Sequence, residues 1–147
     1  MKIENYLKES PLFAISSAYE GVVTKVNQEL KKKNLNLLQA LILTGLLFEK
    51  DEVSPSQLAT VFSTSRGNIS HSISHLEAIG CVKRVVRSED ARGFVIQLKP
   101  EGHKKALGLV KFFDEVQWRF EEAIGILNLK KTLAVLKEFK GISVNSK

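Results

Sequence analysis

Hydrophobic side chains recur at helical spacing over much of the chain. Between Ser10 and Lys33 they return about every three or four residues, behind a serine and a proline that favour a helix start. The segment LLQALILTGLLFE is apolar nearly all round, which predicts a helix in the core, and Asn34 or Asn36 can cap it. Two more amphipathic helices are predicted, one over residues 101–124 and one that starts after Asn128.

Two short helices are predicted in the middle of the chain. Residues 54–57, SPSQ, combine a capping serine, a first-turn proline and a capping-box glutamine, and they open the helix SQLATVF. A turn at Ser63 and Thr64 leads to a second helix, SRGNISHSISHLEAIG, whose Ile69 and Ile73 face inward. Such a pair, over residues 54–80, is typical of a helix-turn-helix, in which the second helix enters the DNA major groove.

The hydrophobic period changes to two residues after Gly80. CVKRVVR is predicted to be a strand, SEDARG a turn and FVIQLK the returning strand, which makes a β-hairpin over residues 82–99. The predicted fold class is therefore mainly α with a small β-hairpin wing. In other words, we expect a winged helix-turn-helix flanked by helices at both ends of the chain.

The chain of 147 residues is predicted to form a single domain, since no repeat or low-complexity linker divides it. The helices of residues 1–34 and 101–147 carry more apolar surface than the module of residues 35–100 can cover. We therefore expect them to be dimerisation helices that pack against a second copy. No apolar run has the length of a membrane span, and the charged N-terminus is unlike a signal peptide. A cytoplasmic homodimer without membrane contact is the expectation.

Positive charge is concentrated in the predicted hairpin. The chain has 22 Lys and Arg against 16 Asp and Glu, a formal net charge of +6. Residues 54–100 hold six basic side chains against three acidic ones, and five of the six lie between residues 83 and 99. A basic patch of this kind is typical of a surface that binds nucleic acid.

Most of the chain resembles the MarR family of winged-helix transcription regulators. The stretches that carry the resemblance are LNLLQALILTGLL, SPSQLATVFSTSRGNISHSISHLEAIGCVKR, SEDARGFVIQLKPEG and FEEAIGILNLKKTLAVLKEF. The third is the most specific, because it has the wing's Asp-x-Arg signature and the entry to the next helix in register. The residues that align with the family's pattern there are Asp90, Arg92, Leu98, Glu101 and Gly102.

The resemblance implies roles for individual side chains. Arg92 at the wing tip would enter the minor groove, whose narrow form attracts arginine, and Asp90 would orient it or fix the turn. Lys83, Arg84 and Arg87 are expected to contact phosphates, although alternation along the strand keeps the three from reaching the same ones. The candidates for contacts in the major groove are Ser65, Arg66, Asn68, Ser70, His71, Ser74 and His75.

Some of these side chains admit a second interpretation. His71 and His75 have the spacing of two helical zinc ligands, but no Glu or Cys at suitable spacing completes a tetrahedral set, so DNA contact or simple solvation is favoured. Cys81, the only cysteine, is interpreted as a small buried hydrophobe in preference to a redox sensor. The aromatic residues near Trp118 fit core or dimer contacts better than an effector pocket. We expect no metal, no cofactor and no enzymatic activity.

These patterns together predict a homodimeric protein that binds double-stranded DNA in a sequence-specific manner. The resemblance implies a transcription regulator, most often a repressor, at a pseudo-palindromic operator, and it leaves room for release by a small-molecule effector. Two alternatives stay open. One is a sequence-tolerant architectural DNA-binding protein, and the other is a winged-helix module for protein interaction.

Overall fold

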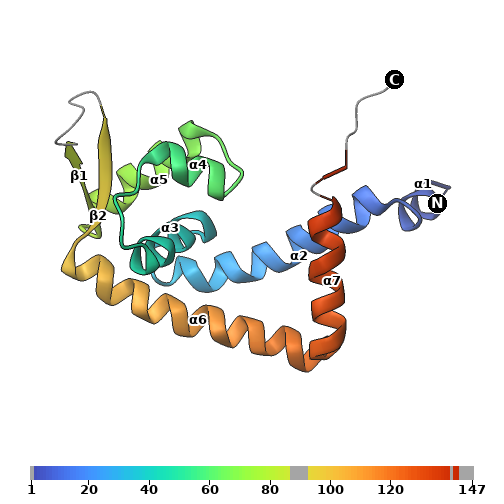
Figure 1. The fold of residues 1–147 in the computed structure, drawn as a ribbon. Coiled ribbons are helices and arrows are strands. Elements are labelled where there is room, and N and C mark those ends of the chain that lie inside the picture. Colours follow the sequence, from blue (N-terminus) through green and yellow to red (C-terminus); the bar gives the residue numbers. More distant parts are fainter. Residues whose placement is uncertain (1, 87–92, 140, 143–147) are drawn as a thin grey trace, which may run out of the picture. The chain divides into compact units, whose positions relative to one another are not determined.

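The computed structural model describes residues 2–86, 93–139 and 141–142. Over these residues the chain is mainly helical, with one antiparallel hairpin, as predicted (Figure 1). Residues Met1–Leu107 and Gly108–Lys147 form two compact units, and the long helix α6 runs from one into the other. The elements are α1 (Lys2–Lys8), α2 (Pro11–Lys31), α3 (Leu37–Phe48), α4 (Pro55–Val61), α5 (Arg66–Ala78), β1 (Val82–Val86), β2 (Phe94–Leu98), α6 (Pro100–Ile124) and α7 (Ile126–Phe139).

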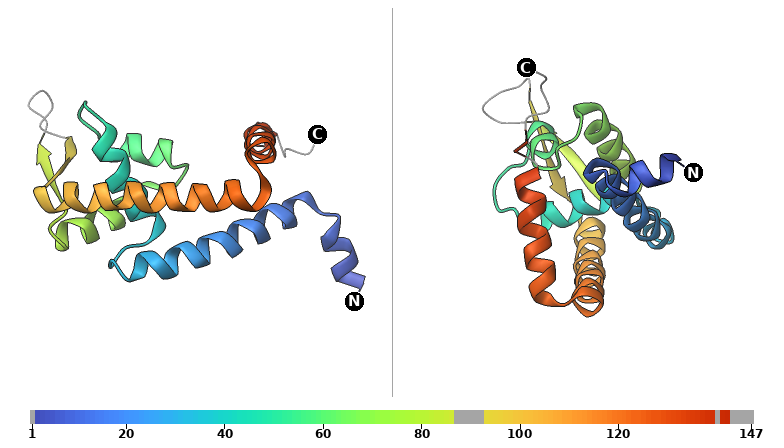
Figure 2. Two further views of the ribbon diagram at one scale, coloured as in Figure 1. Left: turned by 90° about the horizontal axis from the view of Figure 1, so that it is seen from below. Right: turned by 90° about the vertical axis from the view of Figure 1, so that its right-hand side faces the viewer.

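The core of the first unit lies between α3, α5 and the hairpin. Helix α3 packs against α5 and β2, and α5 packs against α4 and β1, an arrangement that Figure 2 shows from two further sides. Ile42, Leu43, Ile69 and Ile73 are completely buried, as the helical pattern predicted. Each such side chain contributes roughly 1.5–3 kcal/mol to stability compared with an exposed one.

Two capping boxes fix where α3 and α4 begin. The Asn36 side chain accepts the Gln39 backbone N–H, and the Gln39 side chain accepts the Asn36 N–H, both at 2.9 Å. Ser54 and Gln57 form the same reciprocal pair at the start of α4, as predicted. Of the two asparagines that could cap α3, Asn34 instead has a left-handed backbone (φ 58°) just beyond α2.

The hairpin follows α5 through a left-handed glycine. Gly80 has φ 73°, and the Cys81 N–H donates to the Leu76 carbonyl at 2.8 Å, which closes the helix. In the hairpin, Val82 pairs with Leu98 and Val86 with Phe94. The segment before α4 forms an isolated antiparallel bridge with β2, in which the Ile96 N–H donates to the Val53 carbonyl at 2.9 Å.

Two helical boundaries differ from the prediction. Helix α1 was not predicted, because its seven residues bury no side chain and are too few for more than one turn of apolar spacing, at Ile3, Tyr6 and Leu7. Helix α7 begins at Ile126, earlier than the predicted start after Asn128. The break lies at Gly125, whose left-handed φ of 78° ends α6 and allows a new helix to start at once (Figure 1).

Candidate nucleic-acid interface

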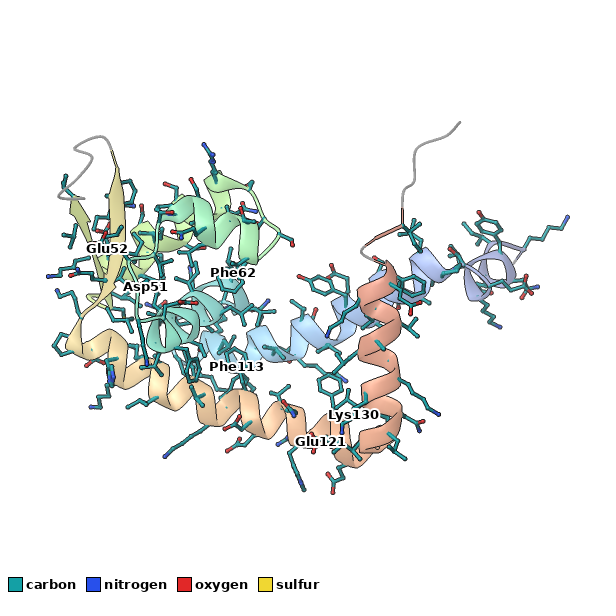
Figure 3. All side chains as sticks on the ribbon, in the orientation of Figure 1. Asp51, Glu52, Phe62, Phe113, Glu121 and Lys130 are labelled. Atoms are coloured by element: carbon teal, nitrogen blue, oxygen red, sulfur yellow. The ribbon has the colours of Figure 1, made fainter. Side chains whose placement is uncertain are left out.

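The two helices of the predicted helix-turn-helix are α4 and α5, joined by a short turn. Ser63 in this turn has φ 49°, and the Thr64 N–H donates to the Ala59 carbonyl at 3.0 Å. The half-buried Phe62 is directed from the end of α4 towards α3 (Figure 3). A Cβ atom added at Gly45 of α3 would lie 3.6 Å from the Phe62 ring, so the ring and α3 are in close contact. The Phe62 ring thus anchors the turn to α3.

One side of α5 is exposed and polar. The buried residues of the helix are Ile69, Ser72, Ile73 and Leu76, which leaves the opposite side to the solvent. All the predicted major-groove residues except His75 lie among the exposed ones, namely Ser65, Arg66, Asn68, Ser70, His71 and Ser74. The structure therefore brings these side chains together on one surface. Whether they contact DNA stays a prediction.

The first turn of α5 holds its polar side chains in place. The Ser65 hydroxyl accepts the Asn68 backbone N–H at 3.1 Å, so its own O–H can still donate to a phosphate. The Asn68 side-chain N–H₂ donates to the Thr64 hydroxyl at 3.0 Å. The Asn68 carbonyl oxygen and second N–H are left for a base, and this pair of groups matches adenine.

His75 lies apart from the other candidates. Its side chain is half-buried, and its Nε2 is 2.9 Å from the Asn34 carbonyl oxygen, at the end of α2. A histidine that donates to this carbonyl joins the exposed helix to the α2–α3 connection. Within the described part of the chain, no three His, Cys, Asp or Glu side chains are grouped to hold a metal ion.

Arg84 on β1 is held by contacts within the protein. Its guanidinium pairs with Glu77, donates to the Ser74 hydroxyl at 3.0 Å and lies 5.3 Å from the centre of the Phe94 ring. Lys83 is exposed and pairs with Gln97 across the hairpin. Both basic residues were predicted to contact phosphates, but the network around Arg84 was not predicted.

The tip of the wing lies outside the described residues. Arg87, Asp90 and Arg92, the predicted phosphate and minor-groove residues, belong to this segment. Their roles stay predictions from the sequence.

Cys81 is buried at the junction of α5, β1 and α6. Its side chain is completely buried, and burial raises the pKa of the thiol, which favours the protonated form. The Cys81 carbonyl oxygen accepts the Lys99 N–H at 2.9 Å. A Cβ atom on Gly102 would lie only 2.0 Å from this oxygen, so the first turn of α6 can pack here only with glycine.

Comparison with solved structures identifies the fold. The chain superimposes on the DNA complex of S. aureus MepR with a TM-score of 0.83 and 18% identity, over 90% of this chain and 96% of the other. CouR from Rhodococcus jostii, bound to p-coumaroyl-CoA, gives a TM-score of 0.78 at 18% identity, over 96% and 98%. The transcription regulator MarR from Oenococcus oeni gives 0.73 at 18% identity, over 88% and 97%.

These matches confirm the predicted resemblance at the level of the fold. The chain has the winged-helix fold of the MarR-type regulators. No family model matches the sequence. No curated protein matches it in sequence either. Across the described residues, no helix combines the length and the apolar character needed to cross a membrane.

Proposed function

We propose that this protein is a transcription regulator that binds double-stranded DNA in a sequence-specific manner. The observation that carries the proposal is the exposed polar side of α5, placed after a helix-turn and directly before a hairpin with basic residues. Short Ser and Asn side chains permit a close approach to the groove, and Arg66 supplies a charged donor suited to guanine. The wing would add contacts to the backbone and the minor groove.

The protein acts as a homodimer in this proposal. Large apolar side chains are exposed on α2, α6 and α7, for example Tyr19 (58% exposed), Trp118 (59%) and Leu127 (71%). A second copy of the chain would remove them from water. Two-fold symmetry would then present two α5 helices to successive major grooves, about 34 Å apart, on a pseudo-palindromic operator.

Control of transcription would be repression, with release by a small-molecule effector. CouR, which shares the fold, is bound to p-coumaroyl-CoA in its crystal structure. An effector that binds better to a dimer with the wrong spacing of its α5 helices would shift the population away from DNA. Repression, the operator and the effector all rest on this likeness in fold.

Selection of binding sites from random duplex DNA tests the proposal directly. The purified protein should enrich a two-fold-related motif at near-physiological salt. An architectural protein would instead bind scrambled DNA almost equally well and lose that affinity as salt rises. A protein-interaction module would bind neither a selected motif nor scrambled DNA, and this result would refute the proposed function.

A further inference from the structure

Arg84 makes more contacts inside the protein than any other basic side chain of the described interface. Its backbone N–H donates to Glu77 Oε1 at 3.1 Å, and its guanidinium pairs with the other carboxylate oxygen of Glu77. A second guanidinium nitrogen donates to Ser74 Oγ at 3.0 Å. The ring of Phe94, on the paired strand β2, lies beneath the charge. The side chain is thus held by Glu77, Ser74 and Phe94.

These contacts engage both terminal nitrogens of the guanidinium, the pair with which Arg84 would grip a phosphate bidentately. The guanidinium charge is matched by Glu77, and both side chains are partly buried, at 34% and 27% exposure. A phosphate that took both terminal nitrogens would have to displace Glu77 and leave its carboxylate exposed to the DNA. Glu77 is also the only acidic residue of α5, so Arg84 neutralises the one side chain of that helix that would repel DNA.

The bond to Ser74 reaches the exposed side of α5. Because Ser74 Oγ accepts from Arg84, its own O–H is directed away from the arginine, and Ser74 is exposed. A hydroxyl held in this way is a donor of defined direction. It matches an acceptor on the edge of a base in the major groove, such as the N7 of a purine.

We infer that Arg84 is a positioning residue and does not itself bind phosphate. Together with Glu77 it fixes the first strand of the wing on the recognition helix α5 and orients the Ser74 hydroxyl as a donor towards DNA. This inference rests on the proposed function. It revises the phosphate contact predicted for Arg84 from the sequence.

The salt dependence of DNA binding distinguishes the two roles. The full-length protein is titrated with its selected duplex at several salt concentrations, as wild type, Arg84→Gln and the matched control Lys83→Gln, which loses the same charge on the same strand. The plot of log K against log salt has a negative slope, and the loss of one phosphate contact makes it less steep by about 0.9 per protomer. We expect Arg84→Gln to keep the wild-type slope and to lose affinity about tenfold at every salt concentration. A slope less steep by about 0.9 per protomer would overturn the inference.

Base preference provides the second readout. We expect Ser74→Ala and Arg84→Gln to relax the motif at the same positions, and Arg84→Lys not to restore it, because lysine lacks the planar fork. Glu77→Gln should also weaken binding, although it removes a negative charge beside the DNA. Tighter binding by Glu77→Gln, or an unchanged motif for Ser74→Ala, would overturn the inference. Ser74→Ala changes only an exposed side chain, so it stays informative even where Arg84→Gln fails to fold.

Failure of the proposed function would look different. The wild-type protein itself would then select no motif, and the positioning role would be rejected with it. If the wild type selects a motif and the variants behave as phosphate-contact variants, only the role of Arg84 is wrong.

Discussion

The close packing between the wing and α6 requires a residue without a side chain at position 102, and Gly102 meets this requirement. Gly102→Ala would place a methyl group against the Cys81 carbonyl, a backbone atom that cannot move without shifting β1. We expect a loss of about 1–3 kcal/mol in the free energy of unfolding, measured by urea titration.

The matched control lies in the same helix. Gly108 of α6 has no atom within 4 Å of an added Cβ, so Gly108→Ala should stabilise the protein by about 0.5–1 kcal/mol through helix propensity. Equal effects at the two positions would mean that the close approach at Gly102 does not constrain the fold.

Cys81 is predicted to be chemically silent in the folded protein. Burial raises the pKa of its thiol, so the thiolate that reacts with alkylating agents is scarce at neutral pH and grows only as the pH rises towards the raised pKa. Iodoacetamide should label the native protein far more slowly than the protein unfolded in urea. Labelling at the same rate in both states would revive the redox interpretation.

At the scale of elements, α5 should carry the base readout. Arg66→Ala and Asn68→Ala should each cost about 1–3 kcal/mol of discrimination and relax the motif at separate positions. His103→Ala is the control, because this exposed residue of α6 lies outside α4, α5 and the hairpin. Competition binding with single-base variants of the selected duplex measures the effect. Uniform losses across all sequences would assign Arg66 and Asn68 to the phosphate backbone.

Elements with local signals could be predicted from the sequence, and those that depend on distant contacts could not. The capping box at Ser54 is a short pattern with one physical meaning, and the structure confirms it. The start of α7 was misplaced, because Asn128 has the side chain of an N-cap, whereas the left-handed Gly125 lets the new helix begin at once.

The same distinction applies to the candidate site. The exposed side of α5 follows from the positions of its apolar residues, so most of its polar side chains could be assigned in advance. The partners of Arg84 and His75 could not be, since each bond joins two elements and depends on how they pack. A basic residue on a strand near a nucleic-acid surface therefore does not reveal by itself whether it binds DNA or an acidic neighbour.

At the scale of the whole molecule, the uncovered apolar helices predict a dimer in solution. Light scattering after size-exclusion chromatography should give twice the chain mass of 16.4 kDa. Leu133 and Leu136 of α7 are exposed in the single chain, and the double change to Glu should favour the monomer. Phe48→Glu is the control, since Phe48 is also apolar and exposed but lies on α3, and it should leave the mass unchanged. A wild-type mass of one chain would contradict the dimer.

The exposed apolar surface of α2 and α7 also affects how operator binding would depend on the concentration of this protein in the cell. If only the paired form binds an operator, then at low expression the number of competent molecules grows with the square of the chain concentration. Occupancy of the promoter would then rise over a narrower range of synthesis rate than for a monomer of the same affinity. The side chains that bury themselves against a second copy would thereby set a threshold dose for the regulator, far from any base that it reads.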